Sequence, residues 1–195
     1  MHASNSNNSV LLGFLTFARL QDHGIVGGYL IVNHLGRPVE FHCSAPVQAN
    51  RAQQILFGPT LRAYVCSEMI GPSLLQSTRL APVVVVTDDA DLGPVQAHCS
   101  APILRLVPLA GLPGSSRDDL PATDPDPQDR QEGAKAAAGS SAETFAWNQY
   151  ACRAFDVTWA LRAETLVTEM GITWDLLEPI ERIRAAISEA HSAAA

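Results

Sequence analysis

The pentapeptide His-Cys-Ser-Ala-Pro occurs twice in this chain, at 42–46 and at 98–102. Histidine and cysteine are the side chains that zinc prefers, and a structural zinc site takes about four of them in a tetrahedron. The two copies together supply such a set, in His42, Cys43, His98 and Cys99. The repeat therefore raises the hypothesis of a metal site with zinc as the cofactor.

The spacing inside each copy argues against that site. Each copy is predicted to lie at a strand end, and neighbouring side chains of a strand point to opposite faces of the sheet. Each histidine should then face away from the adjacent thiol. The usual separation of about two to four residues between zinc-binding cysteines is also missing. We expect partly buried histidines and small apolar cysteines without a cofactor, and we keep zinc as the alternative.

The same residues define a second chemical alternative, in which a cysteine acts as the nucleophile and a histidine as its base. Cys43 or Cys99 would be the nucleophile, with His42 or His98 as the base. Because the adjacent histidine is expected to be turned away, the base would have to be a residue such as His23, His34 or the histidine of the other copy. A metal- or cysteine-dependent enzyme is therefore the alternative function, and the preferred interpretation assigns no catalytic residue.

An acidic cluster, Asp88, Asp89 and Asp91, follows the apolar run at 83–86. Carboxylates after a buried strand are typical of magnesium and phosphoryl-transfer sites, but they are also common in turns, where they accept hydrogen bonds from nearby backbone. The chain has no glycine-rich phosphate loop, and its single lysine, Lys135, lies in a stretch predicted to be disordered. The turn interpretation is therefore favoured.

Aromatic side chains in the C-terminal third are candidate anchors for a protein partner. They are Trp147, Tyr150, Trp159 and Trp174. Large aromatic residues dominate the binding energy of many interfaces, and an amphipathic helix can dock them into a groove. We expect these residues to contact either the N-terminal domain of the same chain or another subunit.

Five apolar segments rich in branched and aromatic side chains predict the strands that must position these residues. They lie at 10–19, 27–33, 38–43, 83–88 and 103–107. Short turns separate the first three, which predicts an antiparallel meander. Gly27 and Gly28 indicate a bulge or the close approach of another backbone.

Two helices are predicted between the third and fourth strands, over 51–57 and 61–70. Asn50 and Thr60 are their expected N-caps, and Gly71 with the following proline is expected to end the second helix. Together with the strands they form an α/β (α+β) domain over 1–111, in which the helices pack on one face of the sheet.

Residues 112–142 contain almost no large apolar side chain, and they cannot bury enough surface to offset chain entropy. A disordered linker or long loop is predicted there. The segment 143–195 is predicted to be a C-terminal helical piece with amphipathic helices over 143–171 and 174–190, the second capped by Thr173. It either packs on the first domain or reaches a partner.

Composition restricts the classes of function. The net charge is −7 with a single lysine, so no basic strip is available for phosphates and nucleic-acid binding is not expected. No apolar run approaches the roughly 20 residues of a membrane span. The polar first nine residues lack the features of a secretory signal. Four cysteines without such a signal are expected to be reduced thiols, which predicts a cytoplasmic location.

The stretch 27–61 contains Gly-Arg-Pro-Val-Glu-Phe-His-Cys and Asn-Arg-Ala-Gln segments and, together with 175–190, resembles a family of uncharacterised, hypothetical bacterial proteins. That resemblance implies no activity. At the level of fold, the predicted order of two strands followed by a helix is similar to that of roadblock and longin-type modules. Roadblock proteins open with a helix, however, whereas this chain is predicted to open with a strand. This similarity implies a dimerising or partner-binding platform. We predict a non-catalytic binding or assembly module that recognises a protein partner or forms a homo-oligomer through its sheet edge or C-terminal helices.

Overall fold

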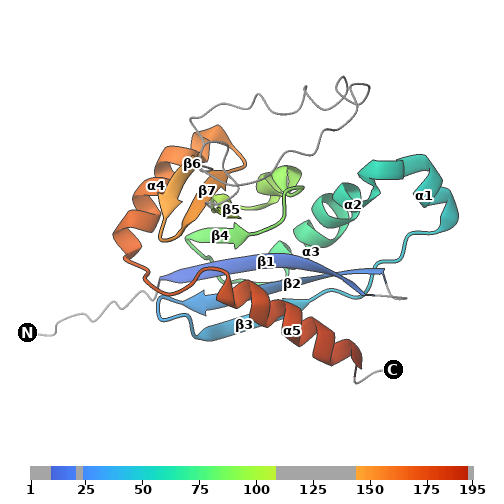
Figure 1. The fold of residues 1–195 in the computed structure, drawn as a ribbon, viewed down its shortest axis with the longest axis horizontal. Helices are drawn as coiled ribbons and strands as arrows, with labels where there is room; N and C mark the ends of the chain where they lie inside the picture. Colours follow the sequence, from blue (N-terminus) through green and yellow to red (C-terminus); the bar gives the residue numbers. More distant parts are fainter. Residues whose placement is uncertain (1–9, 21–23, 109–143, 193–195) are drawn as a thin grey trace, which may run out of the picture.

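A mixed seven-stranded sheet runs through the computed structural model, which describes residues 10–20, 24–108 and 144–192 (Figure 1). The strands are β1 (Leu11–Leu20), β2 (Gly24–Asn33), β3 (Pro38–Cys43), β4 (Val84–Thr87), β5 (Ile103–Pro108), β6 (Thr144–Trp147) and β7 (Tyr150–Ala154). Their order across the sheet is β3-β2-β1-β4-β5-β7-β6. The predicted α/β class is confirmed, and the linker predicted at 112–142 lies outside the described residues.

The first three strands form the predicted antiparallel meander. β1 then pairs in parallel with β4, and β4 pairs in parallel with β5, in the middle of the sheet. Parallel strands are covered on both faces and have continuous apolar sequences. Accordingly, Val84, Val85 and Val86 of β4 are all fully buried. β7 and β6 extend the sheet beyond β5 in antiparallel fashion.

Helices cover both faces of this sheet. The connection from β3 to β5 contributes α1 (Arg51–Phe57), η1 (Gly58–Thr60), α2 (Leu61–Tyr64), η2 (Val65–Ile70), α3 (Gly71–Gln76) and η3 (Gly93–His98). The opposite face carries α4 (Val157–Met170) and α5 (Glu178–Ser192), and α5 crosses β1 and β2 (Figure 1). The C-terminal helices therefore pack on the same sheet as the N-terminal strands. Within the described ranges, no helix combines the length and the apolar character that crossing a membrane requires.

The predicted start of α1 is confirmed, whereas two other helix boundaries differ from the prediction. Asn50 accepts a hydrogen bond from the Gln53 backbone, and the Gln53 side chain accepts one from the Asn50 backbone. Thr60 does not cap α2, because its hydroxyl donates to a backbone carbonyl of the preceding turn. Gly71 does not end the second helix, since the π-helical turn η2 continues into α3 with Pro72 in its first turn, where no backbone donor is needed.

The predicted helix over 143–171 is wrong in its first part. Residues 144–154 form the β6–β7 hairpin, and α4 begins only after Asp156, whose carboxylate accepts from the Thr158 backbone. The hairpin turns at Asn148, which has a φ of 54°, a conformation that asparagine tolerates better than most residues. The free edge of β5 accounts for the difference, because pairing with β7 provides backbone hydrogen bonds that a local pattern cannot reveal.

The break between the two C-terminal helices lies at Gly171, as predicted, with a φ of 59°. Thr173 does not cap the second helix. Asp175 has that role instead, since its side chain accepts a hydrogen bond from the backbone just before α5. The predicted apolar stripe of α5 is confirmed by its buried isoleucines, Ile180, Ile183 and Ile187.

Gly27 and Gly28 mark the place where helices press on β2 from both faces. A Cβ atom at Gly27 would lie 2.5 Å from a methyl group of Ile70, next to α3. A Cβ atom at Gly28 would lie 2.3 Å from a methyl group of Ile183, on α5. The close approach predicted from these glycines therefore exists, but helix side chains rather than another backbone make it.

Candidate functional site

The first copy of the pentapeptide begins at the end of β3, where alternation separates its two reactive side chains. Cys43 lies opposite Gly28, whose Cβ position points at α5. His42 lies opposite Tyr29, which packs in the apolar cluster on the other face. Residues opposite each other in antiparallel strands point to the same face. Cys43 therefore faces α5, and His42 faces the side covered by α3. The two side chains point to opposite faces, as the sequence predicts.

The second copy has a different conformation. His98 is the exposed last residue of η3, and Cys99 follows in an extended conformation. Cys99 packs against the cluster on the α3 side, on the opposite face of the sheet from Cys43. The four side chains do not converge. Across the described parts of the chain, no group of three or more histidine, cysteine, aspartate or glutamate side chains is arranged to hold a metal ion.

None of the four thiols is activated. Burial raises the pKa of Cys43 and of Cys99 above its ordinary value. Burial also raises the pKa of Cys66 to about 11 and that of Cys152 to about 12. A cysteine nucleophile needs the opposite shift, from a neighbouring cation or a helix N-terminus, so the environment of these thiols does not favour cysteine catalysis.

His42 belongs to a chain of hydrogen bonds that begins on β3. Its Nε2 atom lies 2.6 Å from Oε1 of Glu40, and the Thr78 hydroxyl donates to the other Glu40 oxygen at 2.7 Å. The hydrogen bonds from Thr78 and His42 lower the pKa of Glu40, which keeps this carboxylate charged. The chain of contacts ties the edge strand to the segment that follows α3.

The acidic cluster after β4 forms ion pairs with arginines from two helices. Arg62 of α2 donates to the carboxylates of Asp89 and Asp91, and Arg184 of α5 donates to Asp88. Burial raises the pKa of Asp89, but the hydrogen bonds from Arg62 and from the Asp91 backbone outweigh burial, so the net shift is downward. Each of the three carboxylates accepts at least one hydrogen bond from a guanidinium group, which favours a structural role for the cluster.

The aromatic residues predicted as partner anchors have different environments. Trp147 and Tyr150 of the β6–β7 hairpin belong to the core, with exposed fractions of 4% and 7%. Trp174 donates from Nε1 to the His34 carbonyl at 3.1 Å, which ties the segment before α5 to the turn between β2 and β3. Trp159 is half-buried on α4. The Arg162 guanidinium lies over the Trp159 ring, 5.0 Å from its centroid, so all four aromatic side chains make contacts within the chain.

The outer side of β3 is an edge of the sheet in the part of the chain that the structure describes. The Phe41 side chain is 42% exposed. The Ser44 N–H donates to the Gly27 carbonyl, and bonded residues alternate along an antiparallel strand. The N–H and C=O groups of Phe41 and Cys43 therefore point away from β2. We call residues 39–43 the β3 edge, because their outward backbone groups lie beside the exposed apolar side chains of Val39 and Phe41.

A second apolar surface lies on α1, where no residue is buried. Ile55 and Leu56 are exposed, and Phe57 stacks on Tyr64 with 4.4 Å between the ring centroids. The sequence analysis predicted that both helices pack across the sheet, and it did not predict that every residue of α1 stays unburied. The alternation of apolar and polar residues in 38–43 predicts a strand with two different faces, but it contains no information on whether another strand covers its outer side.

Neither sequence comparison identifies a relative. No protein-family model matches the chain, and no curated protein matches it significantly. The resemblance to uncharacterised bacterial proteins, and the similarity in fold to roadblock and longin-type modules, stay predictions. Function is therefore argued from the geometry of the chain itself.

Proposed function

We propose that the protein is a non-catalytic assembly module that pairs with a second copy of itself through the β3 edge. The observation that carries this proposal is the state of Phe41, whose ring is partly exposed and whose backbone N–H and C=O point outward from the sheet. An unpaired edge strand is a template for another strand, and proteins usually protect those edge strands that must not pair with another chain.

The β3 edge is complementary to itself, which favours a second copy over an unrelated strand. In an antiparallel pair with its two-fold axis at Phe41, the two Phe41 rings lie next to each other. Glu40 of each copy then lies opposite His42 of the second copy. The Glu40 carboxylate is charged and can accept a hydrogen bond from the His42 imidazole of the second copy, and an aromatic cross-strand pair contributes about 0.2–1 kcal/mol.

The geometry of β3 also limits the strength of such pairing. A bulge in the β2–β3 pair between Ile31 and Val32 shortens the regular part of the edge. Only a few residues of each copy would pair, and interfaces below about 1,200 Å² are typical of weak complexes. We therefore expect a reversible dimer whose population rises with protein concentration.

Sedimentation velocity over a series of protein concentrations tests the proposal. Phe41→Glu places like charges across the two-fold axis, and Cys43→Pro removes an outward N–H while leaving the bonds to β2 intact. Each variant is expected to raise the dimer dissociation constant by about tenfold or more. Leu161→Glu is the matched control, because Leu161 is an exposed apolar residue on α4, away from β3.

Two results would overturn the proposal. One is a wild-type protein that stays monomeric at the highest concentration reached. The other is a dimer that persists in Phe41→Glu and Cys43→Pro when circular dichroism shows both variants folded. Loss of the dimer in those two variants but not in Leu161→Glu supports pairing through the β3 edge.

A further inference from the structure

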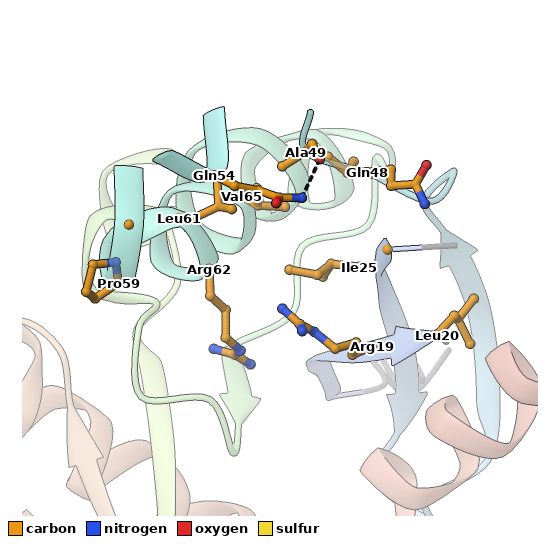
Figure 2. Close-up of a pocket in the computed structure, with 13 residues that line it drawn as sticks. Arg19, Leu20, Ile25, Gln48, Ala49, Gln54, Pro59, Leu61, Arg62 and Val65 are labelled. Atoms are coloured by element: carbon orange, nitrogen blue, oxygen red, sulfur yellow. Dashed lines mark hydrogen bonds between the residues drawn. The ribbon is translucent and has the colours of Figure 1, made fainter. Parts of the chain in front are cut away.

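A cavity of about 620 Å³ opens beyond the end of β1, between the start of β2 and the helices α1 and α2 (Figure 2). Its volume is within the range of small-molecule sites, which is about 300–1,000 Å³. In sheets with parallel strands, ligands bind beyond the carboxyl ends of the strands. Arg19 and Leu20 at the carboxyl end of β1 line the cavity, and β4 runs parallel to the earlier part of β1, where it pairs with residues 12–14.

The charged side chains that line the cavity are both positive. Arg19 comes from β1 and Arg62 from α2, and no carboxylate is among the described lining residues. Figure 2 shows the two arginine side chains extending toward each other, with Ile25 beside them. The chain as a whole carries a net charge of −7, and Asp89 and Asp91 pair with Arg62, so Arg19 supplies the positive charge that pairs with no described carboxylate.

The two arginines differ in how firmly they are held. Arg62 is fixed by Asp89, which is buried, and by Asp91. These hydrogen bonds involve its two terminal nitrogens and leave its Nε–H without a partner among the described residues. Arg19 is exposed and forms no hydrogen bond or ion pair with any described residue. The cavity therefore contains one preorganised guanidinium and one that is available to a ligand.

The remaining walls define the kind of molecule that would fit. Branched apolar side chains of Ile25, Val47, Leu61 and Val65 line the cavity. The Gln54 amide donates to the Ala49 carbonyl at 3.0 Å, which leaves the carbonyl oxygen of that amide as an acceptor. The site offers cationic donors at one place and hydrocarbon surface at another, as a ligand with a charged head and an apolar body requires.

We propose that this cavity binds a small organic anion, with its phosphate or carboxylate group between Arg19 and Arg62 and its apolar body against the branched side chains. The planar guanidinium group can donate two hydrogen bonds to a pair of oxygens of a carboxylate or a phosphate. The proposal is independent of pairing through the β3 edge, because the cavity lies at the carboxyl end of β1 and includes no residue of 39–43.

Calorimetric titration with phenyl phosphate, inorganic phosphate and phenol tests the proposal at constant ionic strength. We expect saturable binding of phenyl phosphate, at least about fivefold tighter than inorganic phosphate because the ring is buried, and no measurable binding of phenol. Arg19→Gln should weaken phenyl phosphate binding by about tenfold or more, because a charge-assisted contact is lost. Arg37→Gln, which removes an exposed arginine of the β2–β3 turn, should leave it unchanged.

The experiment has clear contrary outcomes. Equal affinity for inorganic and phenyl phosphate would mean an adventitious ion only, and the apolar walls would then have no part in recognition. Equal weakening by Arg19→Gln and Arg37→Gln would mean that binding depends on overall charge rather than on the cavity. Absence of saturable phenyl phosphate binding would overturn the proposal outright. Arg19→Gln should also leave the sedimentation behaviour unchanged, which separates this test from that of the β3 edge.

Discussion

The packing of α5 against β2 allows a quantitative prediction for the stability of the Gly28→Ala variant. The new Cβ atom would lie 2.3 Å from Cγ2 of Ile183 and 3.1 Å from Cδ1 of Ile187. Isoleucine in a helix has one strongly preferred χ1 rotamer, so Ile183 cannot turn away, and overpacking of this kind costs about 1–3 kcal/mol. Alanine recovers about 0.5–1 kcal/mol relative to glycine in a strand. We expect a net loss of up to about 2.5 kcal/mol in the free energy of unfolding.

A double-mutant cycle with Ile183→Ala isolates the contact. Ile183→Ala removes the obstructing methyl group and should itself cost about 2–5 kcal/mol, because Ile183 is buried. In that background Gly28→Ala should be neutral or stabilising. Urea denaturation followed by circular dichroism measures all four proteins, and Gly93→Ala is the control, since its nearest neighbour is Phe155 at 3.7 Å. An equal penalty for Gly28→Ala in both backgrounds would refute the packing of α5 on β2.

Three further predictions concern other contacts. The pKa of Asp89 is lowered in the folded state, so its contribution to stability is present above the unfolded pKa of about 3.9 and is lost as pH falls through the folded value. Asp89→Asn should therefore flatten the dependence of the urea midpoint on pH below about pH 5. Iodoacetamide at pH 8 should modify Cys43 first, whereas Cys66 and Cys152, which are buried, should react only after unfolding; equal rates in intact-mass spectra would contradict their burial. Trp174→Phe removes the hydrogen bond to the His34 carbonyl and should cost about 0.5–1.5 kcal/mol in thermal or urea unfolding, with little change in helix content.

Much of the N-terminal fold is predictable from local patterns. The three strands of the meander and the apolar run at 83–86 have the composition and period of strands, and each occurs where expected. The Asn50 cap is predictable for the same reason, because its partner Gln53 lies within one turn. Predictions of secondary structure fail where a segment far away in the sequence selects between a helix and a strand. The hairpin at 144–154 has an apolar spacing that fits a helix as well as a strand, and the edge of β5 selects the strand.

The duplicated pentapeptide shows why the candidate site was harder to predict than the fold. Cys43 takes its conformation from pairing with β2, whereas His98 ends a 3₁₀ helix. In the second copy, the Gln96 side chain donates to the backbone carbonyl of Ala101 and accepts from the Ile103 N–H. Nothing in the five shared residues specifies these different partners. Alternation explains the separation of His42 from Cys43. The two thiols are separated because Cys43 faces α5, whereas Cys99 packs in the cluster on the opposite face of the sheet.

The features that carry the two proposals share one property: each is a group that the fold leaves without a partner among the described residues. The outward backbone groups of Phe41 meet no further strand of the described residues, and Arg19 places a charged group at the carboxyl end of β1. Local sequence predicts a strand in both places, but not which strand is last in the sheet or where a strand end meets a cavity. Those facts depend on strand order, and strand order is set by contacts between residues far apart in the chain. Function in this protein is therefore expected where strand order leaves donors and acceptors free, and variants of Phe41 and Arg19 should separate assembly from ligand binding.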